Sequence, residues 1–535
     1  MAQLIIGNFA NGLDLRKSHD TAPPGSLRVL RNVFINDGGE IEKRKAWARN
    51  AWLTAYGQTP AYKGKISGPH LADVIGSDRI FFRHRHDSLP PEWGTTDAGW
   101  SALSIIGDVR PITVYAMRSE VPLTDYGAFF RGNSLAHYAS KAHLIESFWA
   151  NDPTNLDNRH FEISLSAAGE PLSEVLITDN DNRTAVAVFR TKAYFAQYKT
   201  VAISAVADPG DMAGTGSGAI DVRTQGKSIG RILGFGEYFG ELCIIGTRGV
   251  QFWQMDPDPD QNQYLRWTPA QIVGERSIIG YGDGDIVFMG DDGIRSMTAR
   301  DSSNIATLLD IGSPIDRLVR EFVAQAGEYA VIDGDLQSTA PFVGLNPSVI
   351  HPETGQLWMF AGTQVFVYAN HPGAKVRAWS IFDLPEVSPG NIQGRVGLAM
   401  NAWCADVAPV ARNVMIRNYA DEIYIYGGPD GDTYDGSEAE VITPHMDAGR
   451  PGTEKYWRGI DMSCSGTWTV YLSFDPSNIE WERVAVIQNG SIARLHGMIP
   501  IGRSSYHIAI RAICTSSMAA RISQIVLYHD QEDEK

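Results

Sequence analysis

Short apolar runs separated by glycine-rich turns recur along most of this 535-residue chain. Between residues 229 and 255 the order is apolar run, tight turn, apolar run, tight turn, apolar run. Glycine adopts positive φ without steric cost, so these turns reverse the chain by a simple mechanism. Strand-length runs joined by such turns predict an antiparallel meander.

The same unit recurs three more times, with uneven spacing. It is an apolar strand, a glycine turn, and a strand that carries an aromatic residue; the copies are 285–297, 355–382 and 421–435. Repeated meanders of roughly 40 to 70 residues are typical of propeller blades. We therefore predict a mainly β protein, with an irregular β-propeller and inserted loops over residues 66–435.

Two segments fit helices instead of strands. Residues 142–149 are compatible with a short helix. Residues 313–326 predict a longer one, in which Ser313 is the N-cap, Pro314 the first helical residue, and Asp316 an acid in the first turn. Its apolar residues recur at helical spacing and predict a packing face: Ile315, Leu318, Val319, Phe322 and Val323.

Residues 436–535 predict a separate β-sandwich. Four strand-like runs are separated by turn signals at sandwich spacing: 468–472, 484–487, 506–512 and 522–528. The last six residues are polar and are expected to fray.

Residues 1–65 precede the blade pattern and predict an amino-terminal assembly or platform segment. In the run 40–44, strand alternation places Glu40, Glu42 and Arg44 on one face and Ile41 and Lys43 on the other. A strand edge with charges of both signs resists indiscriminate pairing but suits a chosen partner. Glu40, Glu42, Lys43 and Arg44 are therefore the candidate assembly interface, and reversing their charges is expected to leave the monomer folded but impair assembly.

Composition narrows the function classes. The chain carries 46 basic and 62 acidic residues, a net charge of −16, which disfavours a sequence-reading nucleic-acid protein. An acidic channel lining would still let DNA pass, because it repels phosphate; simple solubility is the plainer account. The hydrophobic share of 43% and the length favour a folded protein of two or three domains.

The cysteines and the apolar runs give further expectations. Cys243, Cys404, Cys464 and Cys514 lack CxxC spacing, which favours buried thiols made in a reducing cytoplasm over disulfides or zinc. Neither a secretion signal nor an apolar run of membrane-spanning length is recognisable.

Three polar clusters could bind a metal. His84 and His86 share a strand face but lack a third ligand, so an exposed turn is the better interpretation. Asp256, Asp258 and Asp260 could attract Ca²⁺, although their intervening prolines favour a solvated surface loop. The run 430–435 resembles half of a calcium loop but lacks its final glutamate, which favours a hairpin turn. Neither a nucleophile elbow nor a P-loop occurs, so we expect no enzyme, cofactor or metal.

Two stretches resemble bacteriophage tail nozzle proteins, also called tail tubular protein B, of short-tailed phages. At the amino end the shared elements are Phe9, Gly12, Asp14, Arg16, Pro24–Gly25, Asn32 and Gly39–Arg44. In the middle they are Ser204–Ala205, Asp208–Pro209, Asp211, Gly218–Val222, Gly249–Trp253, Asp285–Met289 and Asp292–Arg295, with Met212 where the family has Trp. Residues 350–435 match loosely and 51–200 do not match.

The resemblance implies a structural virion protein without catalytic residues. It implies a hexameric ring, built on a β-propeller, that closes the distal end of the tail, retains the genome and conducts DNA during ejection. Its expected partners are the adaptor or tail tubular A ring, tail fibres or spikes, and genomic DNA in the lumen. Its expected location is the virion tail, after synthesis in the host cytoplasm. The alternative is a propeller-type receptor- or glycan-binding tail protein, including a polysaccharide depolymerase; that class needs a pair of carboxylates across a cleft, which the sequence does not single out.

Overall fold

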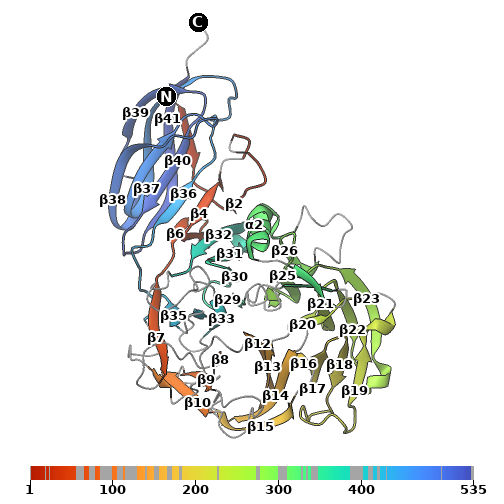
Figure 1. The fold of residues 1–535 in the computed structure, drawn as a ribbon. Helices are drawn as coiled ribbons and strands as arrows, with labels where there is room; N and C mark the ends of the chain where they lie inside the picture. Colours follow the sequence, from red (N-terminus) through yellow and green to blue (C-terminus); the bar gives the residue numbers. More distant parts are fainter. Residues whose placement is uncertain are drawn as a thin grey trace. The chain divides into compact units, whose positions relative to one another are not determined.

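The computed structural model shows a mainly β protein (Figure 1). It describes residues 2–55, 183–298, 310–326, 347–385, 422–495 and 497–531, except 19, 23–24, 226–227, 273–276 and 429. Between these ranges it describes the segments 66–71, 79–84, 99–104, 112–114, 129–138, 141–149, 156–165, 171–179, 329–332, 335–338, 402–407 and 414–418. None of the helices within these residues is long and apolar enough to cross a membrane.

The chain forms two compact units. Unit 1 contains Met1–Ala48, Ile350–Glu386 and Ile425–Lys535, whereas unit 2 contains Arg49–Val349 and Val387–Tyr424. The grouping differs from the three consecutive ranges predicted from the sequence, because the amino-terminal segment and residues 350–386 join the carboxy-terminal strands in unit 1.

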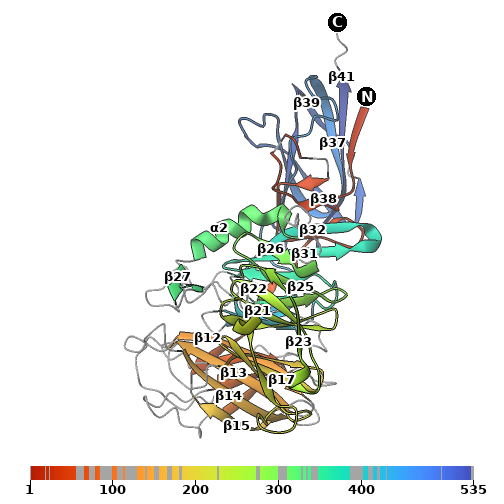
Figure 2. The same cartoon turned by 90° about the vertical axis from the view of Figure 1, so that its right-hand side faces the viewer.

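Unit 2 contains three four-stranded antiparallel sheets whose strands are neighbours in chain order. The first sheet is β12 (Phe129–Tyr138), β13 (Lys141–Trp149), β14 (Leu156–Leu165) and β15 (Pro171–Asp179), seen side by side in Figure 2. The short helix predicted at 142–149 is therefore wrong. That segment is strand β13, hydrogen-bonded to β12 on one side and β14 on the other. Its apolar residues recur at helical spacing, but pairing with two flanking strands overrides this local signal.

The second and third sheets repeat this order. The second is β16 (Arg183–Phe189), β17 (Lys192–Gln197), β18 (Thr200–Ile203) and β19 (Gly218–Asp221). The third is β20 (Ile232–Tyr238), β21 (Glu241–Gly246), β22 (Gly249–Gln254) and β23 (Gln263–Pro269). The meander predicted over 229–255 is confirmed and extended by β23. Strands β12, β16 and β20, each the first of its sheet, contact one another in turn, and β20 also contacts β25.

Further strands of the described chain form smaller sheets. One antiparallel sheet contains β24 (Ile279–Tyr281), β25 (Asp285–Met289) and β26 (Ile294–Ser296), which confirms the predicted pair at 285–297. A second contains β8 (Ile66–Leu71), β9 (Arg79–His84) and β10 (Gly99–Ser104), and a third contains β27 (Tyr329–Ile332) and β28 (Asp335–Ser338). The five-stranded sheet has the order β11 (Ile112–Val114), β7 (Trp47–Ala55), β35 (Glu422–Tyr426), β34 (Val414–Asn418) and β33 (Ala402–Val407).

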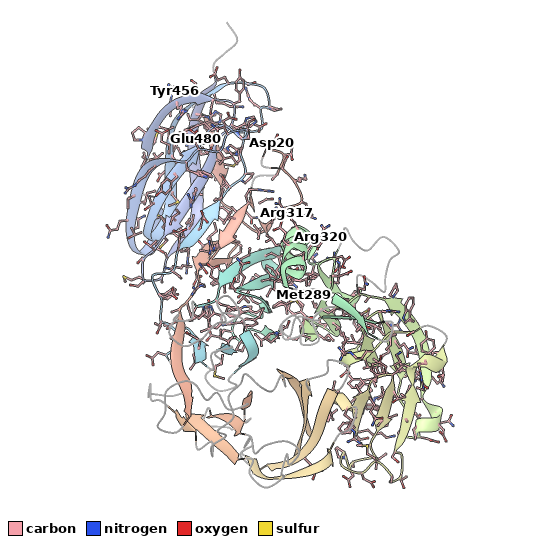
Figure 3. The ribbon with its side chains drawn as sticks, in the orientation of Figure 1. Asp20, Met289, Arg317, Arg320, Tyr456 and Glu480 are labelled. Carbon is pink, nitrogen blue, oxygen red and sulfur yellow. The ribbon has the colours of Figure 1, made fainter. Side chains whose placement is uncertain are left out.

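The helix predicted at 313–326 is present but begins differently. A 3-10 turn, Ser313–Ile315, precedes α2, Asp316–Ala326, and the N-cap is Gly312 without a side-chain hydrogen bond. The predicted cap by Ser313 is therefore wrong, because Ser313 already lies inside the helical turn. The predicted packing face is confirmed at Ile315, Val319 and Val323, which are buried. The opposite face carries Arg317 and Arg320, labelled in Figure 3, which are exposed.

The carboxy-terminal strands of unit 1 surround one long strand, β37 (Lys455–Ser473). Strands β38 (Glu482–Leu495) and β39 (Ile499–Ser505) pair with it, as do β40 (Ala509–Cys514) and β41 (Arg521–Gln531), all antiparallel. The strands predicted at 468–472, 484–487 and 522–528 are confirmed within β37, β38 and β41. The run 506–512 begins later than predicted, at Ala509.

Strands from the amino-terminal segment complete this sheet. Strand β1 (Ala2–Ile6) pairs along β41, as Figure 1 shows, and β6 (Ile41–Lys43) pairs with β41 and with β5 (Val33–Ile35). Strand β36 (Ala439–Ile442) lies between β40 and β4 (Val29–Arg31). Two short strands, β2 (Gly12–Leu13) and β3 (Ser26–Leu27), pair with each other.

The meander predicted at 355–382 also belongs to this sheet. It contains β30 (Leu357–Ala361), β31 (Gln364–His371) and β32 (Val376–Asp383), which are antiparallel neighbours, and β29 (Ser348–Ile350) precedes them and lies beside β30. Strand β32 meets β4 through a parallel bridge between Ile381 and Arg31. Three stretches of chain far apart in sequence thus share one hydrogen-bonded sheet.

Candidate functional site: the amino-terminal joint

We call the polar contacts around Asn32 and Glu40–Arg44 the amino-terminal joint. Its hairpin is set by Asn36, whose Oδ1 accepts hydrogen bonds from the backbone N–H of Gly38 at 2.9 Å and of Glu40 at 3.0 Å. Gly39 has a φ of +76°, which favours glycine. The turn at residues 37–39 therefore forms by side-chain bonding to the backbone together with one left-handed residue.

The predicted alternation of the run 40–44 is correct for its inner face. Ile41 and Lys43 are both fully buried, and Glu42 is half-buried on the other face. Arg44 departs from the prediction because β6 ends at Lys43; its side chain is buried although it was expected beside Glu40 and Glu42.

Glu40 and Glu42 face Arg521 of strand β41. The Arg521 Nη1 lies 3.1 Å from Glu40 Oε2, and its Nη2 lies 3.9 Å from Glu42 Oε2. Burial alone would raise the pKa of Glu40, but the hydrogen bond from Asn36 and the charge of Arg521 lower it. These two acids therefore bind within their own chain, across the β6–β41 ladder.

Lys43 has no access to solvent, yet its ammonium group is bonded. Its Nζ donates to the backbone carbonyl of Asp435 at 2.9 Å and to that of Ser516. Burial lowers the pKa of Lys43, because desolvation disfavours the charged form. The lysine therefore connects β6 to two loops that lie 392 and 473 residues further along the chain.

Asn32 is the centre of the joint. It has a φ of +55°, a conformation that asparagine tolerates better than most residues, and it is buried. Its Oδ1 accepts from Arg44 Nε and from the Asp383 backbone N–H, both at 2.8 Å. Its Nδ2 donates to Asp383 Oδ2 at 2.6 Å and to the Glu438 carbonyl at 2.7 Å. One amide therefore makes all four of its hydrogen bonds, to partners on three separate stretches of the chain.

Arg44 extends this network. Besides Asn32, it donates to the Lys45 carbonyl at 2.7 Å and to Asp435 Oδ2 at 3.2 Å. Burial raises the pKa of Asp435, but the charge of Arg44 and hydrogen bonds from Ser437 outweigh it and lower that pKa. The guanidinium is thus bonded mainly to neutral oxygens and to a single carboxylate.

These contacts correct one part of the interface prediction. The run 40–44 was expected to offer an edge to a partner strand, but β6 already has β5 on one side and β41 on the other. Its two basic residues are buried inside unit 1, so reversing their charge is now expected to disrupt folding. The role of Glu40, Glu42, Lys43 and Arg44 in assembly stays a prediction.

Other residues of the amino-terminal resemblance also have defined contacts. Phe9 is fully buried, and Asp14 makes a two-pronged ion pair with Arg16 at 2.9 and 2.7 Å. A Cβ on Gly12 would lie 2.6 Å from Ala378 Cβ, and one on Gly25 would lie 2.4 Å from the Asn8 carbonyl oxygen. Both glycines therefore permit close approach of two backbones.

An aromatic cluster lies beside the joint in unit 1, and sequence reasoning missed it. Tyr426 packs edge-on against Trp47 at 5.3 Å and Trp358 at 4.7 Å, and His351 stacks on Trp358 at 5.0 Å. The Tyr426 hydroxyl accepts the Lys45 backbone N–H at 3.0 Å, and burial raises the pKa of Tyr426. The available signal was the aromatic residue in the strands of each predicted meander.

The middle stretch of the resemblance forms a second buried network, in unit 2. Arg295 binds Asp316 through two bonds at 2.6 and 3.1 Å, and it lies 3.2 Å from Asp292 and 3.7 Å from Asp310. Burial lowers the pKa of Arg295, but the hydrogen bonds and charges of these carboxylates outweigh it and raise that pKa. A Cβ on Gly293 would lie 2.1 Å from Asp316 Oδ1, so this position needs glycine.

Two further residues of that stretch have structural contacts. Buried Gln251 donates to the Val222 carbonyl at 2.9 Å and accepts from Trp253 Nε1 at 3.2 Å. Met212, which replaces the family tryptophan, packs on the cluster of Val186, Ala193 and Phe195. An apolar side chain thus fills this position despite the substitution.

The candidate metal sites have different outcomes. The three acids at 256–260 lie in a surface loop in which Asp256 and Asp258 accept backbone N–H groups, as the solvated interpretation predicted. The predicted hairpin at 430–435 is wrong, because residues 432–438 form no strand after the turn. His84 ends β9, and His86 lies outside the described residues. Within those residues, no group of three or more His, Cys, Asp or Glu side chains could hold a metal ion.

The cysteines follow the sequence interpretation where they are described. Cys243, Cys464 and Cys514 are buried free thiols, and burial raises the pKa of Cys464 to about 11. The side chain of Cys404 lies outside the description.

Comparisons with known proteins do not assign a family. No protein-family model and no curated protein matches the chain. Among solved structures, one similar chain is a Bacteroides uniformis protein assigned as a 6-phosphogluconolactonase. It is 10% identical, with a TM-score of 0.32, over 80% of this chain and 99% of that one. A likeness this weak carries no argument about fold or activity.

Proposed function

We propose that this protein is a structural, ring-forming component of a short phage tail, a nozzle that closes the tail end, retains the genome and conducts DNA during ejection. The proposal starts from the sequence resemblance. It is supported by the contacts of the residues that carry the resemblance, which hold the backbone of both units.

The strongest support is that several residues of the resemblance occupy positions that few residue types can fill. Asn32 has positive φ and makes four hydrogen bonds, Gly12 and Gly293 lie where a Cβ would collide, and Lys43 is a buried ammonium bonded to carbonyls. These contacts support the proposal because the residues that carry the resemblance hold the local backbone in place.

We further propose that the sheets of unit 2 are the blades of an irregular propeller and that the carboxy-terminal strands form a sandwich. Supporting the propeller, three consecutive four-stranded meanders pair in chain order, and their first strands β12, β16 and β20 contact one another. In a propeller the first strand of each blade lies innermost, beside its neighbours. The long strand β37, paired on both sides, fits the sandwich.

In this proposal six copies form the ring, which contacts an adaptor or tail tubular A ring, tail fibres or spikes, and DNA in its lumen. The net charge of −16 is compatible with a lumen that repels phosphate. Its location is the virion tail, and its role there is structural, without a catalytic step.

Mass photometry and negative-stain imaging of the purified chain test the proposal. We expect a sixfold ring, alone or after mixing with an adaptor ring. A stable monomer or trimer that shortens a capsular polysaccharide would refute it and favour a glycan-cleaving tail protein.

A further inference from the structure

Phe239 is an exposed aromatic residue held in an unfavourable backbone conformation. It forms the tip of the β20–β21 hairpin with Gly240, and its side chain is 63% exposed. Its φ is +47° and that of Gly240 is +82°, so both central residues of the turn have positive φ. Asn or Asp followed by Gly is the usual choice for such a turn, and a bulky residue there is unusual. Residues in sparsely populated backbone conformations cluster at functional sites.

A second hairpin tip lies beside this ring. The Phe239 backbone N–H donates to the Gly284 carbonyl at 3.3 Å, and a Cβ on Gly284 would lie 3.2 Å from Phe239 Cδ1. On its other side, the ring packs edge-on against Tyr238, with centroids 4.7 Å apart. The ring is thus held at one edge and along Gly284, while most of its surface faces solvent.

Two exposed acids lie in the same two hairpins as the ring. Glu237 stands two residues before Phe239 in β20, and Asp283 is next to Gly284. Neither side chain forms a hydrogen bond or ion pair with another described residue. The neighbouring acids differ: Glu241 pairs with Arg266 at 2.8 Å, and Asp285 accepts backbone N–H groups from Ile286 and Thr298. Within the described residues, the tip surface therefore combines an exposed aromatic face with two uncompensated negative charges.

The same sheet shows how such a combination holds a cation. The Arg266 guanidinium lies 4.1 Å from the centre of the Phe252 ring while it pairs with Glu241. An aromatic face and a carboxylate together bind guanidinium through cation–π attraction and an ion pair. Phe239 with Glu237 and Asp283 offers these two elements to an external group.

We propose that Glu237, Phe239 and Asp283 form a docking surface for an arginine-bearing segment of a protein partner. The guanidinium stacks on the Phe239 ring and its N–H groups bind the two carboxylates. Placing the aromatic ring at the hairpin tip requires the unfavourable positive φ of Phe239, and partner binding accounts for a bulky residue at this position. The proposal does not depend on the nozzle function, since it uses only the geometry and charge of these two hairpins.

Substitution of Phe239 by asparagine separates binding from folding. Asn suits positive φ, so F239N is expected to raise Tm by about 1–2 °C while removing the ring. A fluorescein-labelled (Arg-Gly)4 peptide is titrated by anisotropy against the full chain in 50 mM salt. We expect F239N to weaken Kd about two- to fivefold, the range of an exposed cation–π contact. Ala207→Asn, at another exposed position with a φ of +60°, is the matched control and should leave Kd unchanged.

The charge contribution has its own pair of variants. E237Q/D283N should weaken peptide binding at least as much as F239N, whereas E438Q/E480Q removes two exposed charges elsewhere and should not; Glu480 is labelled in Figure 3. Equal peptide affinity of wild type and F239N overturns the proposal, as does a fall in Tm on F239N, which would make the ring a structural element. Phe239-dependent binding of maltohexaose instead of the peptide would replace it with a glycan site.

Discussion

Arg44 of unit 1 and Arg295 of unit 2 are both buried, yet their surroundings differ in charge. Arg44 is bonded to an amide oxygen, a carbonyl and one partly exposed carboxylate. Arg295 lies among three aspartates, one of which, Asp310, has no exposed side-chain surface. Both arginines also donate to backbone carbonyls, so the two networks differ in the number of carboxylates, one at Arg44 and three at Arg295. Burial alone therefore does not predict how the stability of the protein changes when a buried arginine is mutated or the pH is changed.

The variant with the largest expected effect tests whether the amino-terminal joint is required for the folding of unit 1. K43E/R44E would place carboxylates against the carbonyl groups of Asp435, Ser516 and Lys45, at a cost above about 5 kcal/mol, enough to prevent folding of that unit. E40K/E42K breaks the partly exposed pairs with Arg521 and two long hydrogen bonds from Asn36, at 3.4 and 3.3 Å, and should cost only about 1 kcal/mol. Circular dichroism and urea unfolding measure both. A folded K43E/R44E protein that fails to assemble would restore the original interface prediction.

Replacing each arginine by methionine tests directly whether the number of neighbouring carboxylates determines the change in stability. R295M should cost about 3–5 kcal/mol, because it leaves three carboxylates close together. Without the arginine the carboxylates repel one another, and proton uptake removes this repulsion, so the stability lost at pH 7 should partly return as pH falls towards 5. R44M leaves a single carboxylate, and its stability should not recover in acid. Urea midpoints at both pH values measure this contrast, and an equal acid response of the two variants would contradict it.

Asn32 separates backbone strain from hydrogen bonding within the joint. N32A should lose about 3 kcal/mol, from orphaned partners and from an alanine in the left-handed region. N32G relieves that strain and should lose about 1 kcal/mol less. Chemical unfolding of the two variants gives the difference directly. If they unfold at the same urea concentration, the positive φ contributes nothing to the preference for asparagine here.

Strand positions could be predicted from the sequence far better than these polar networks. Alternating apolar runs and glycine turns are local signals, and they located the meander at 229–255 and the strands of the carboxy-terminal region. The prediction for the run 142–149 failed, because Leu144, Ile145, Phe148 and Trp149 recur at helical spacing and do not alternate as in a half-buried strand. Hydrogen bonding to the two neighbouring strands makes this segment a strand, and the local sequence pattern gives no information about that pairing.

The burial of Lys43 and Asn32 could not be predicted for a similar reason. Their partners, Asp435, Ser516 and Asp383, are separated from them by about 350 to 470 residues, and the sequence gives no signal of that pairing. A strand ending in Lys43 and Arg44 resembles a solvated edge, because lysine and arginine are rarely buried unless they are paired.

The smallest expected effect is the contribution of Asp435 to the loss of stability at low pH. The pKa of Asp435 is lowered in the folded state, so its stabilising contribution is complete above the ordinary aspartate pKa and disappears as pH falls through the folded value. Because Asp435 is about one-third exposed, the contribution is expected to be at most about 1 kcal/mol. D435N should therefore be slightly less stable at pH 7 and show a flatter loss between pH 5 and 3. Thermal unfolding across that range measures it, and parallel curves would remove Asp435 from the acid response.

The pairing of β1 with β41 has a consequence for the order of synthesis. Ala2–Ile6 are made roughly 520 residues before the strand that pairs with them, Ile525–His529. At translation rates of about 5–20 residues per second this interval is about half a minute to two minutes, during which most of unit 2 has left the ribosome. The sheet of unit 1 cannot form completely until the carboxy-terminal strands are synthesised. Unit 2 therefore has time to fold first, and the backbone groups of β1 that bind β41 stay unpaired during this interval.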